Sequence, residues 1–297
     1  FNIGVGVLLC ILNLLASCDR NAHQSEKDGE LSVALAWQDA DDNGTAINEV
    51  CLWIFNAVDS SLVVEEHVDD IRDLSSRRFY LGEGSYKILA AINFVEPFFV
   101  GQTARSEVSL AGLLFALSQP SVSPQHAYFG VVDVTISKGT GVCVVTDVLK
   151  RILAEMTITI TGVPEGAVLT GKVMNAAKGI LPCRKNADGE YGVADENLVE
   201  VDLPATTAQG TTISTETFRL MPTISGGYAS RLYFQLTTPD GMIREYDIEA
   251  PVMNIAGKYL INLKYEEMRP YMYLSAVNIK NWTEGWIHKG EILNPQK

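Results

Sequence analysis

The sequence predicts an all-β chain of two β-sandwich domains in tandem, with one short helix in the first domain. Short runs of alternating or β-branched residues recur along it with turn residues between them, as in sandwiches and barrels rather than alternating strands and helices. Hydrophobic residues make up 47% of the chain, which is enough for well-packed cores. About 280 residues remain after the expected leader, more than one core usually serves, so we expect two domains.

The first half of the chain contains six predicted strands. Each is a short apolar or alternating run that is bounded by polar or turn-forming residues. They are Leu31–Trp37, Val50–Asn56, Phe79–Leu81, Tyr86–Ile92, Ala127–Ile136 and Val142–Val145. These strands suffice for one sandwich.

One segment of the first half departs from this pattern. In Ser106–Ser118 the apolar residues recur at helical spacing, and Pro120 follows just past the end. We therefore expect a helix here, packed over one sheet. An insertion that covers a sheet edge is the alternative.

The second half opens with the clearest strand of the chain. From Ile152 to Ile160 apolar residues occupy every second position, which is the period of a half-buried strand. We place the domain boundary just before it, giving domains 31–147 and 148–297. Further strands and two hairpin turns are expected at Val168–Met174, Asp188-Gly189, Leu198–Leu203, Arg231–Thr237, Pro239–Gly241, Met242–Ile248, Lys258–Tyr265 and Tyr271–Ile279.

The N-terminal segment is expected to be a processing signal. The apolar run Ile3–Leu15 would span roughly 20 Å as a helix, too little for roughly 30 Å of bilayer hydrocarbon. The run ends in Leu14-Leu15-Ala16-Ser17-Cys18, which resembles the lipobox of bacterial lipoprotein precursors. This resemblance implies a signal peptide at 1–17, a lipid on Cys18 and a polar tether over 18–30. A fortuitous cysteine after an ordinary signal peptide, or a buried first strand, is the alternative.

The charge balance limits the classes of partner. The formal net charge is −13, and an acidic surface repels phosphate backbones and anionic headgroups. We therefore expect no nucleic-acid partner. Attachment to a membrane would have to come from lipid rather than from a basic patch.

Three cysteines remain beyond the leader and the lipobox: Cys51, Cys143 and Cys183. Because the number is odd, any disulfide leaves one thiol over. Cys51 and Cys143 could pair if their strands lie side by side, but we expect buried free thiols. None has the paired spacing of a zinc site.

No motif for catalysis or for cofactor binding stands out. Asp39–Gly44 copies the start of a calcium loop, but Val50 stands where the bidentate Glu belongs, so we interpret it as an acidic hairpin loop. Neither H-E-x-x-H nor G-x-S-x-G occurs. The sequence therefore predicts no catalytic residue, no metal site and no cofactor, although a carboxylate pair built from distant loops stays open.

Several motifs follow one another in a fixed order along the chain. They are Gly84 with Tyr86–Asn93, Phe129-Gly130 with Leu149–Ile160, Thr238–Gly241 with Gly257–Leu263, and the closing Ile279–Trp286. Their order, together with the lipobox, resembles the fimbrillin superfamily of the Bacteroidota, in particular the FimB-like anchor and minor subunits of type V pili. The resemblance covers the chain from about Leu31 to Trp286.

This resemblance implies two transthyretin-like sandwiches, export as an outer-membrane lipoprotein and no enzyme activity. It also implies assembly with other fimbrial subunits by β-strand donation, with the terminal strands as contacts. Stalk subunits of the family are cut by an arginine-specific protease. No arginine here is clearly placed for this, which favours a terminal anchor. We assign Trp282 and Trp286 to the core.

Two other function classes stay open. One is a glycan-binding surface lipoprotein or tip adhesin, for which Trp37, Trp53 or Tyr228 would form an aromatic platform. The other is a hydrolase whose site is built from loops. An open groove with an unpaired strand edge would instead favour assembly.

Overall fold

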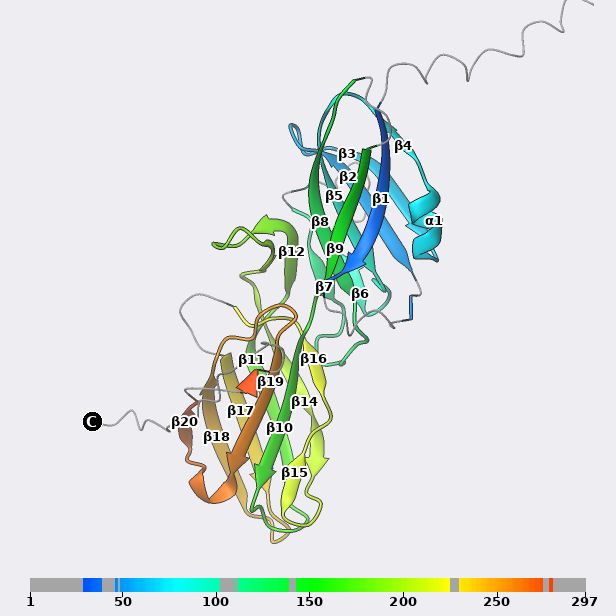
Figure 1. The fold of residues 1–297 in the computed structure, drawn as a ribbon. Helices are drawn as coiled ribbons and strands as arrows, with labels where there is room; N and C mark the ends of the chain where they lie inside the picture. The colour runs from blue at the N-terminus through cyan, green and yellow to red at the C-terminus, as the bar shows by residue number, and fades with distance from the viewer. Residues whose placement is uncertain are drawn as a thin grey trace, which may run out of the picture.

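The computed structural model describes residues 29–38, 46–47, 49–101, 110, 112–138, 143–224, 230–274 and 278–279. Within these residues strands dominate, and the one α-helix is α1 (Ile71–Ser76). The strands gather in two lobes that lie end to end (Figure 1). This arrangement confirms the predicted all-β class with tandem sandwiches and one short helix in the first.

The first lobe is a seven-stranded sheet in the order β3-β2-β5-β8-β9-β1-β4. Because β8 and β9 pair only at Tyr128↔Arg151 and Phe129↔Lys150, the sheet divides there into two layers. Leu31 and Val33 from one layer and Ile54 from the other lie in one buried cluster between the layers. The strands are β1 (Gly29–Trp37), β2 (Val50–Asn56), β3 (Leu62–Val68), β4 (Phe79–Leu81), β5 (Gly84–Ile92), β8 (Tyr128–Ile136) and β9 (Cys143–Arg151).

The second lobe is a sandwich of two sheets. One sheet has the order β15-β10-β19-β21 with β16 also on β10, and the other has the order β14-β11-β17-β18-β20. Met156 and Ile158 of β10 and Phe234 of β17 are buried in the same core cluster between them. The strands are β10 (Ala154–Thr161), β11 (Val168–Ala177), β14 (Leu198–Thr207), β15 (Thr212–Ser214), β16 (Phe218–Leu220), β17 (Ser230–Thr237), β18 (Ile243–Ala250), β19 (Lys258–Lys264), β20 (Tyr271–Tyr273) and β21 (Asn278–Ile279).

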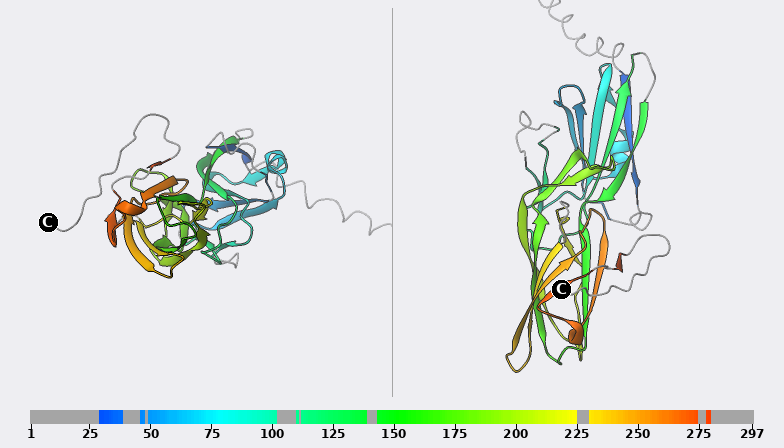
Figure 2. Two further views of the ribbon diagram at one scale, coloured as in Figure 1. Left: turned by 90° about the horizontal axis from the view of Figure 1, so that it is seen from below. Right: turned by 90° about the vertical axis from the view of Figure 1, so that its left-hand side faces the viewer.

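A small sheet of strands from both halves lies between the lobes. Its order is β13-β12-β7-β6, from β6 (Phe98–Val100), β7 (Phe115–Leu117), β12 (Gly179–Lys185) and β13 (Tyr191–Ala194). A third buried cluster accompanies it, in which Phe115 and Phe129 share their surroundings with Ile180 and Met221. The β12–β13 hairpin reaches from the second half toward the first lobe, as the views in Figures 1 and 2 show.

The helix predicted at Ser106–Ser118 is wrong over the part that the structure describes. Phe115–Leu117 is strand β7, which pairs with β6 on one side and β12 on the other. All three residues are buried. A short run that is apolar at every position has no period, so periodicity cannot separate strand from helix there. The helix lies instead at α1, where the Asp70 carboxylate caps the first turn by accepting from the Arg72 N–H.

The expected domain boundary after position 147 falls inside β9, which continues to Arg151. β10 begins at Ala154, and only Ile152 and Leu153 join the two strands. We propose that these two residues mark the boundary.

Several expectations concern residues outside the described ranges. They are the signal peptide at 1–17, Cys18, the calcium-like loop Asp39–Gly44, Tyr228, Trp282 and Trp286. The tether was expected to extend to residue 30, whereas β1 begins at Gly29. No helix among the described residues is long and apolar enough to span a bilayer.

Candidate functional site

The surface best suited to assembly is one side of strand β18 in the second lobe. β18 pairs with β17 along its whole length. On its other side, β20 pairs only with Asp247–Glu249. Among the described residues no strand pairs with that side of β18 between Ile243 and Tyr246. A sheet edge of this kind can accept a further strand.

The direction of the backbone groups along β18 follows from its contacts with the chain around β20. The Asp247 N–H donates to the Pro270 carbonyl at 2.7 Å, so odd-numbered residues of β18 face the β20 side. Ile243 and Glu245 therefore direct their N–H and C=O groups toward the open part of that edge. The structure thus presents backbone donors and acceptors for an added strand.

Strand β19, at the corresponding end of the other sheet, is also covered only in part. β21 pairs with Tyr259 and Leu260, and within the described residues the rest of that side has no partner strand.

Large hydrophobic side chains are exposed beside the β18 edge: Met242 (47%), Ile243 (57%) and Tyr271 (73%). Exposed apolar side chains next to an open edge are typical of an interaction surface.

The chain from the end of β19 through β20 to Leu274 completes the core at this side of the lobe. Met268 and Met272 are buried there, and Tyr265 and Leu274 pack against the same cluster half-buried. Methionine is unbranched and adapts to irregular spaces. The core beside the two edges is therefore able to repack around an inserted side chain.

The β12–β13 hairpin of the second half is fixed to the first lobe by a polar cluster. Tyr191 donates from its hydroxyl to Asp133 Oδ2 at 2.7 Å. The Lys87 ammonium contacts both groups and lies 4.4 Å from the centre of the Tyr191 ring. Burial, and next the hydrogen bond to Asp133, raise the pKa of Tyr191 to about 12, so its hydroxyl stays a donor.

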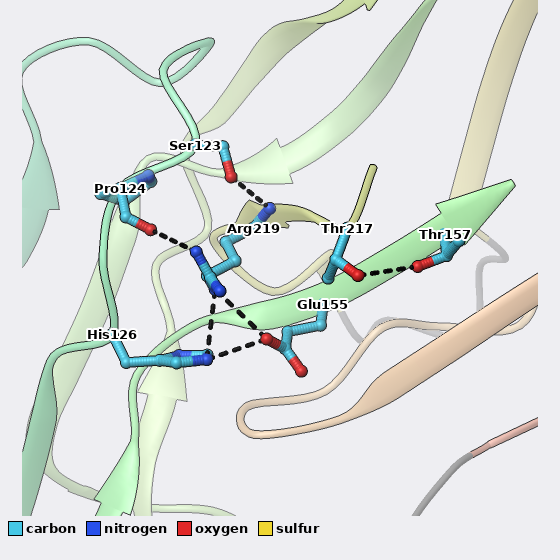
Figure 3. A network of polar contacts seen from close by, with 7 residues as sticks. All are labelled: Ser123, Pro124, His126, Glu155, Thr157, Thr217 and Arg219. Atoms are coloured by element: carbon cyan, nitrogen blue, oxygen red, sulfur yellow. Dashed lines mark hydrogen bonds and ion pairs between the residues drawn. The ribbon is translucent and has the colours of Figure 1, made fainter. Parts of the chain in front are cut away.

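A second polar network joins the segment before β8 to the start of the second lobe (Figure 3). His126 Nε2 lies 2.8 Å from Glu155 Oε1, and Arg219 Nε donates to the same oxygen at 3.2 Å. Figure 3 shows the three side chains converging from the loop, β10 and β16. The hydrogen bond from His126 is the largest influence that lowers the pKa of Glu155 to about 2. Glu155 is therefore ionised at neutral pH.

The same arginine also holds the loop backbone. The Arg219 N–H donates to Ser123 Oγ at 2.9 Å, and its Nη1 donates to the Pro124 carbonyl at 3.3 Å. These contacts fix the relation between the loop and β16. The network is a structural contact between the lobes.

The three cysteines beyond Cys18 are free thiols, as expected. β5 and β8 separate the strands of Cys51 and Cys143, so these two residues do not form a disulfide. Cys51 is buried, whereas Cys143 and Cys183 are only half-buried. Burial, and next the charge of Glu49, raise the pKa of the Cys51 thiol. A protonated thiol is not a nucleophile.

The aromatic platform considered for a glycan site is not formed by the two described tryptophans. Trp53 is 3% exposed. Trp37 packs edge-on against Tyr128, with ring centroids 4.9 Å apart. The Trp53 indole is thus too buried to stack on a sugar ring, and the Trp37 indole is half-buried.

A polar cavity of about 460 Å³ lies between the β12–β13 hairpin and the second lobe. Among the residues that the structure describes, its lining includes Lys150, Asp188 and Glu190, but no histidine, cysteine or aromatic side chain. The hydroxyl of its Thr223 is hydrogen-bonded to Ser230 Oγ at 2.7 Å. The cavity lining therefore lacks the nucleophile–histidine pair that a Ser–His hydrolase requires.

The sequence did not predict the open edge of β18 or the contact between Lys87 and Tyr191 that holds the β12–β13 hairpin. Lys87 and Tyr191 are 104 positions apart, and the open edge of β18 depends on which strand lies beside it. Neither has a local sequence signal. The alternation in Met242–Ile248 was visible, but alternation is the same in edge and central strands.

The comparisons with known proteins agree with an assembly component. The family model of fimbrillin-A-associated anchor proteins Mfa1 and Mfa2 matches residues 21–288. No curated protein sequence matches the chain.

Solved structures share the fold at low sequence identity. The fimbrial anchor protein Mfa2 from Porphyromonas gingivalis superposes with a TM-score of 0.55 at 12% identity, covering 86% of this chain and 98% of its own. A protein from Bacteroides ovatus, provisionally described as an adhesin, has a TM-score of 0.55 at 12% identity, and the match covers 80% of this chain and 88% of that protein. A Bacteroides thetaiotaomicron protein, provisionally described as polysaccharide-binding, superposes with a TM-score of 0.52 at 12% sequence identity. The match covers 90% of this chain and 100% of that protein.

The family match covers nearly the whole chain, so the resemblance drawn from the sequence motifs is confirmed. The fold of the Mfa2 structure agrees with it. This chain belongs to the family of fimbrillin-A-associated anchor proteins Mfa1 and Mfa2, and it is a non-enzymatic fimbrial subunit.

Proposed function

We propose that the chain is an anchor or accessory subunit that fixes fimbriae at the outer membrane through a lipid on Cys18. In this proposal it joins the neighbouring subunit by β-strand addition. The observation that carries the assembly role is the open side of β18 at Ile243–Tyr246, next to the partly covered β19. Lipid attachment is supported by the lipobox-like residues up to Cys18.

A strand added at β18 would bind through main-chain hydrogen bonds, while its alternate side chains would give specificity. Each such hydrogen bond contributes about 0.5–1.5 kcal/mol net. Apolar side chains of the added strand would face Met268 and Met272, which can adjust their rotamers. The affinity therefore depends on both the edge and the core behind it.

The assembly role can be tested at one residue of the edge. Glu245→Pro removes an N–H that faces the open side, and proline is tolerated on edge strands at such positions. Glu245→Ala is the matched control because it keeps the N–H. We expect Glu245→Pro to fold, by circular dichroism, but to lose incorporation into fimbriae, whereas Glu245→Ala is incorporated. Normal incorporation of folded Glu245→Pro would contradict strand addition at β18.

The anchor role is tested at Cys18. We expect Cys18→Ala to move the protein out of the outer-membrane fraction and to release fimbriae into the medium. Deletion of the gene should likewise detach fimbriae or change their length or number. If deletion leaves the fimbriae unchanged in all three respects, the chain is not their anchor.

A glycan-binding lipoprotein or tip adhesin is the second candidate. Its support is the fold shared with the protein that is provisionally described as polysaccharide-binding. A glycan array with the purified chain decides this. Saturable binding to one glycan class, together with normal fimbriae after gene deletion, would favour this second function.

A further inference from the structure

Three donor side chains of different chemistry converge at one end of the β2–β3 pair. Cys51 of β2 stands directly opposite His67 of β3. Glu49 precedes Cys51 by two residues and therefore lies on the same face. His67 Nδ1 is 3.2 Å from Cys51 Sγ and 3.5 Å from Glu49 Oε1. One donor atom of each residue lies within 4.8 Å of the other two.

These separations match the edges of a metal coordination tetrahedron. Typical zinc bonds of about 2.3 Å to sulfur and about 2.0 Å to nitrogen or oxygen place tetrahedral donor atoms roughly 3.3–3.5 Å apart. The observed 3.2 Å and 3.5 Å differ from this range by little. The third pair of donors, Cys51 Sγ and a Glu49 carboxylate oxygen, also lies within 4.8 Å, so side-chain rotations can bring the three atoms around one ion.

A further carboxylate lies behind the imidazole. His67 Nε2, the nitrogen that faces away from Cys51, is 3.5 Å from Glu65 Oε1. The Trp53 indole N–H donates to this same oxygen at 3.2 Å. Histidines that bind a metal through one nitrogen usually donate the other N–H to a carboxylate, which orients the ring. Glu65 and Trp53 supply this support.

The charge and the exposure of the cluster also suit a cation. In the part of the chain that the structure describes, neither Glu49 nor Glu65 forms an ion pair with a lysine or arginine. The His67 side chain is 51% exposed and that of Glu49 is 29% exposed. Cys51 is 3% exposed. An ion can therefore enter from solvent and bind with the sulfur on its protein side.

We propose a zinc site in which Glu49, Cys51 and His67 are ligands, water is the fourth ligand and Glu65 orients His67. Sulfur, nitrogen and carboxylate donors together favour Zn²⁺ over the hard cations Mg²⁺ and Ca²⁺. Binding displaces the thiol proton to solvent and forms no covalent bond other than the coordinate ones. The ion would connect the edge strand β3 to β2, and this inference does not depend on the assembly role.

The test uses the full chain with Zn²⁺ alone, and with Co²⁺ as a spectroscopic substitute. We expect one Zn²⁺ per chain by calorimetry. Co²⁺ should give the thiolate-to-metal charge-transfer absorption and the d–d bands of a tetrahedral site. Cys51→Ser should remove the charge-transfer absorption, and His67→Ala should weaken Zn²⁺ binding at least tenfold. Glu65→Gln should weaken it about 10- to 100-fold.

Two variants serve as matched controls. Cys143→Ser removes a thiol elsewhere in the same lobe, and Glu66→Gln changes the neighbour of Glu65 that pairs with Arg77 instead. Both should bind Zn²⁺ as the parent does. Because Cys51→Ser alters a buried position, the exposed His67→Ala is the decisive variant. Absence of stoichiometric binding to the parent chain, or unchanged binding by folded His67→Ala, would overturn the proposal.

Discussion

Gly130 of β8 and Asp147 of β9 lie against each other inside the first lobe. A Cβ atom on Gly130 would stand 2.3 Å from Asp147 Oδ1 and 2.8 Å from the Val148 carbonyl oxygen, so glycine is required there. Asp147 is 1% exposed. Burial raises the pKa of Asp147 to about 7, and the nearby backbone N–H groups offset only part of this shift. A carboxyl group that titrates near neutral pH therefore lies within β9.

Asp147→Asn should stabilise the protein at alkaline pH. The wild-type carboxyl has a pKa of 3.8 when unfolded and about 7 when folded, so its native state loses stability as pH rises through this window. The amide stays neutral. We expect the variant to be more stable by roughly 2–4 kcal/mol at pH 8, with the difference vanishing near pH 4. Urea unfolding of both proteins across this range measures it, and a difference independent of pH would contradict the assignment.

Glu155→Gln should have the opposite pH dependence. The Glu155 carboxyl has an ordinary pKa of 4.5 and a folded pKa of about 2, so its stabilising effect is present above 4.5 and is lost as pH falls through the folded value. At neutral pH we expect the glutamine variant to lose roughly 2–3 kcal/mol. The gap between the two proteins should narrow below pH 4.5. Chemical denaturation at several pH values checks this, with exposed Glu200→Gln as a control that should change little.

At the scale of elements, Tyr191 holds the β12–β13 hairpin to the first lobe by a hydrogen bond to Asp133. Tyr191→Phe removes the hydroxyl that donates to Asp133 but keeps the ring beneath Lys87. We expect hydrogen exchange of the β12 and β13 amides to speed up roughly five- to tenfold, equivalent to about 1 kcal/mol. Exchange in β17 and β18 should not change. Equal acceleration in both regions would indicate global rather than local destabilisation.

Element prediction from sequence succeeded where one face of a strand is buried and the other is not. In β10 burial alternates along Met156, Ile158 and Ile160, and the pattern was visible in the chain. β2 and β4 begin and end as predicted. β6, β15 and β16 have three residues each, too few to display a period. β3 was not predicted, because its adjacent carboxylates Glu65 and Glu66 interrupt any apolar alternation.

At the scale of the molecule, the two lobes share a buried cluster rather than meeting as separate bodies. Phe115 and Phe129 of the first half lie in one cluster with Ile180 and Met221 of the second. We therefore expect one cooperative thermal transition by calorimetry, with equal calorimetric and van't Hoff enthalpies. Ile180→Ala should destabilise both lobes by about 2–4 kcal/mol. Two well-separated transitions in the parent protein would contradict a shared core.

The shared cluster also marks the limit of inference from the sequence. Two sandwiches could be predicted because each half has enough strands of its own. The β12–β7 pairing could not, because Gly179↔Ala116 and Ile180↔Phe115 join positions far apart in the chain and no local pattern specifies such a partner. The open edges of β18 and β19 depend on tertiary arrangement in the same way. The family motifs gave the class of protein, but they did not locate its contact surfaces.

The parallel pairing of β1 with β9 has a mechanical consequence. β1 pairs with β9 in register from Leu31↔Cys143 to Trp37↔Leu149, and β9 leads through two residues into β10, which pairs in parallel with β19. A pull on the N-terminal end of β1, directed along the strands, would load these hydrogen bonds together in shear rather than opening them one at a time. In the proposed anchor, force would thus pass from the membrane through β1, β9, β10 and β19 into the second lobe, whose other sheet carries the β18 edge proposed for the next subunit.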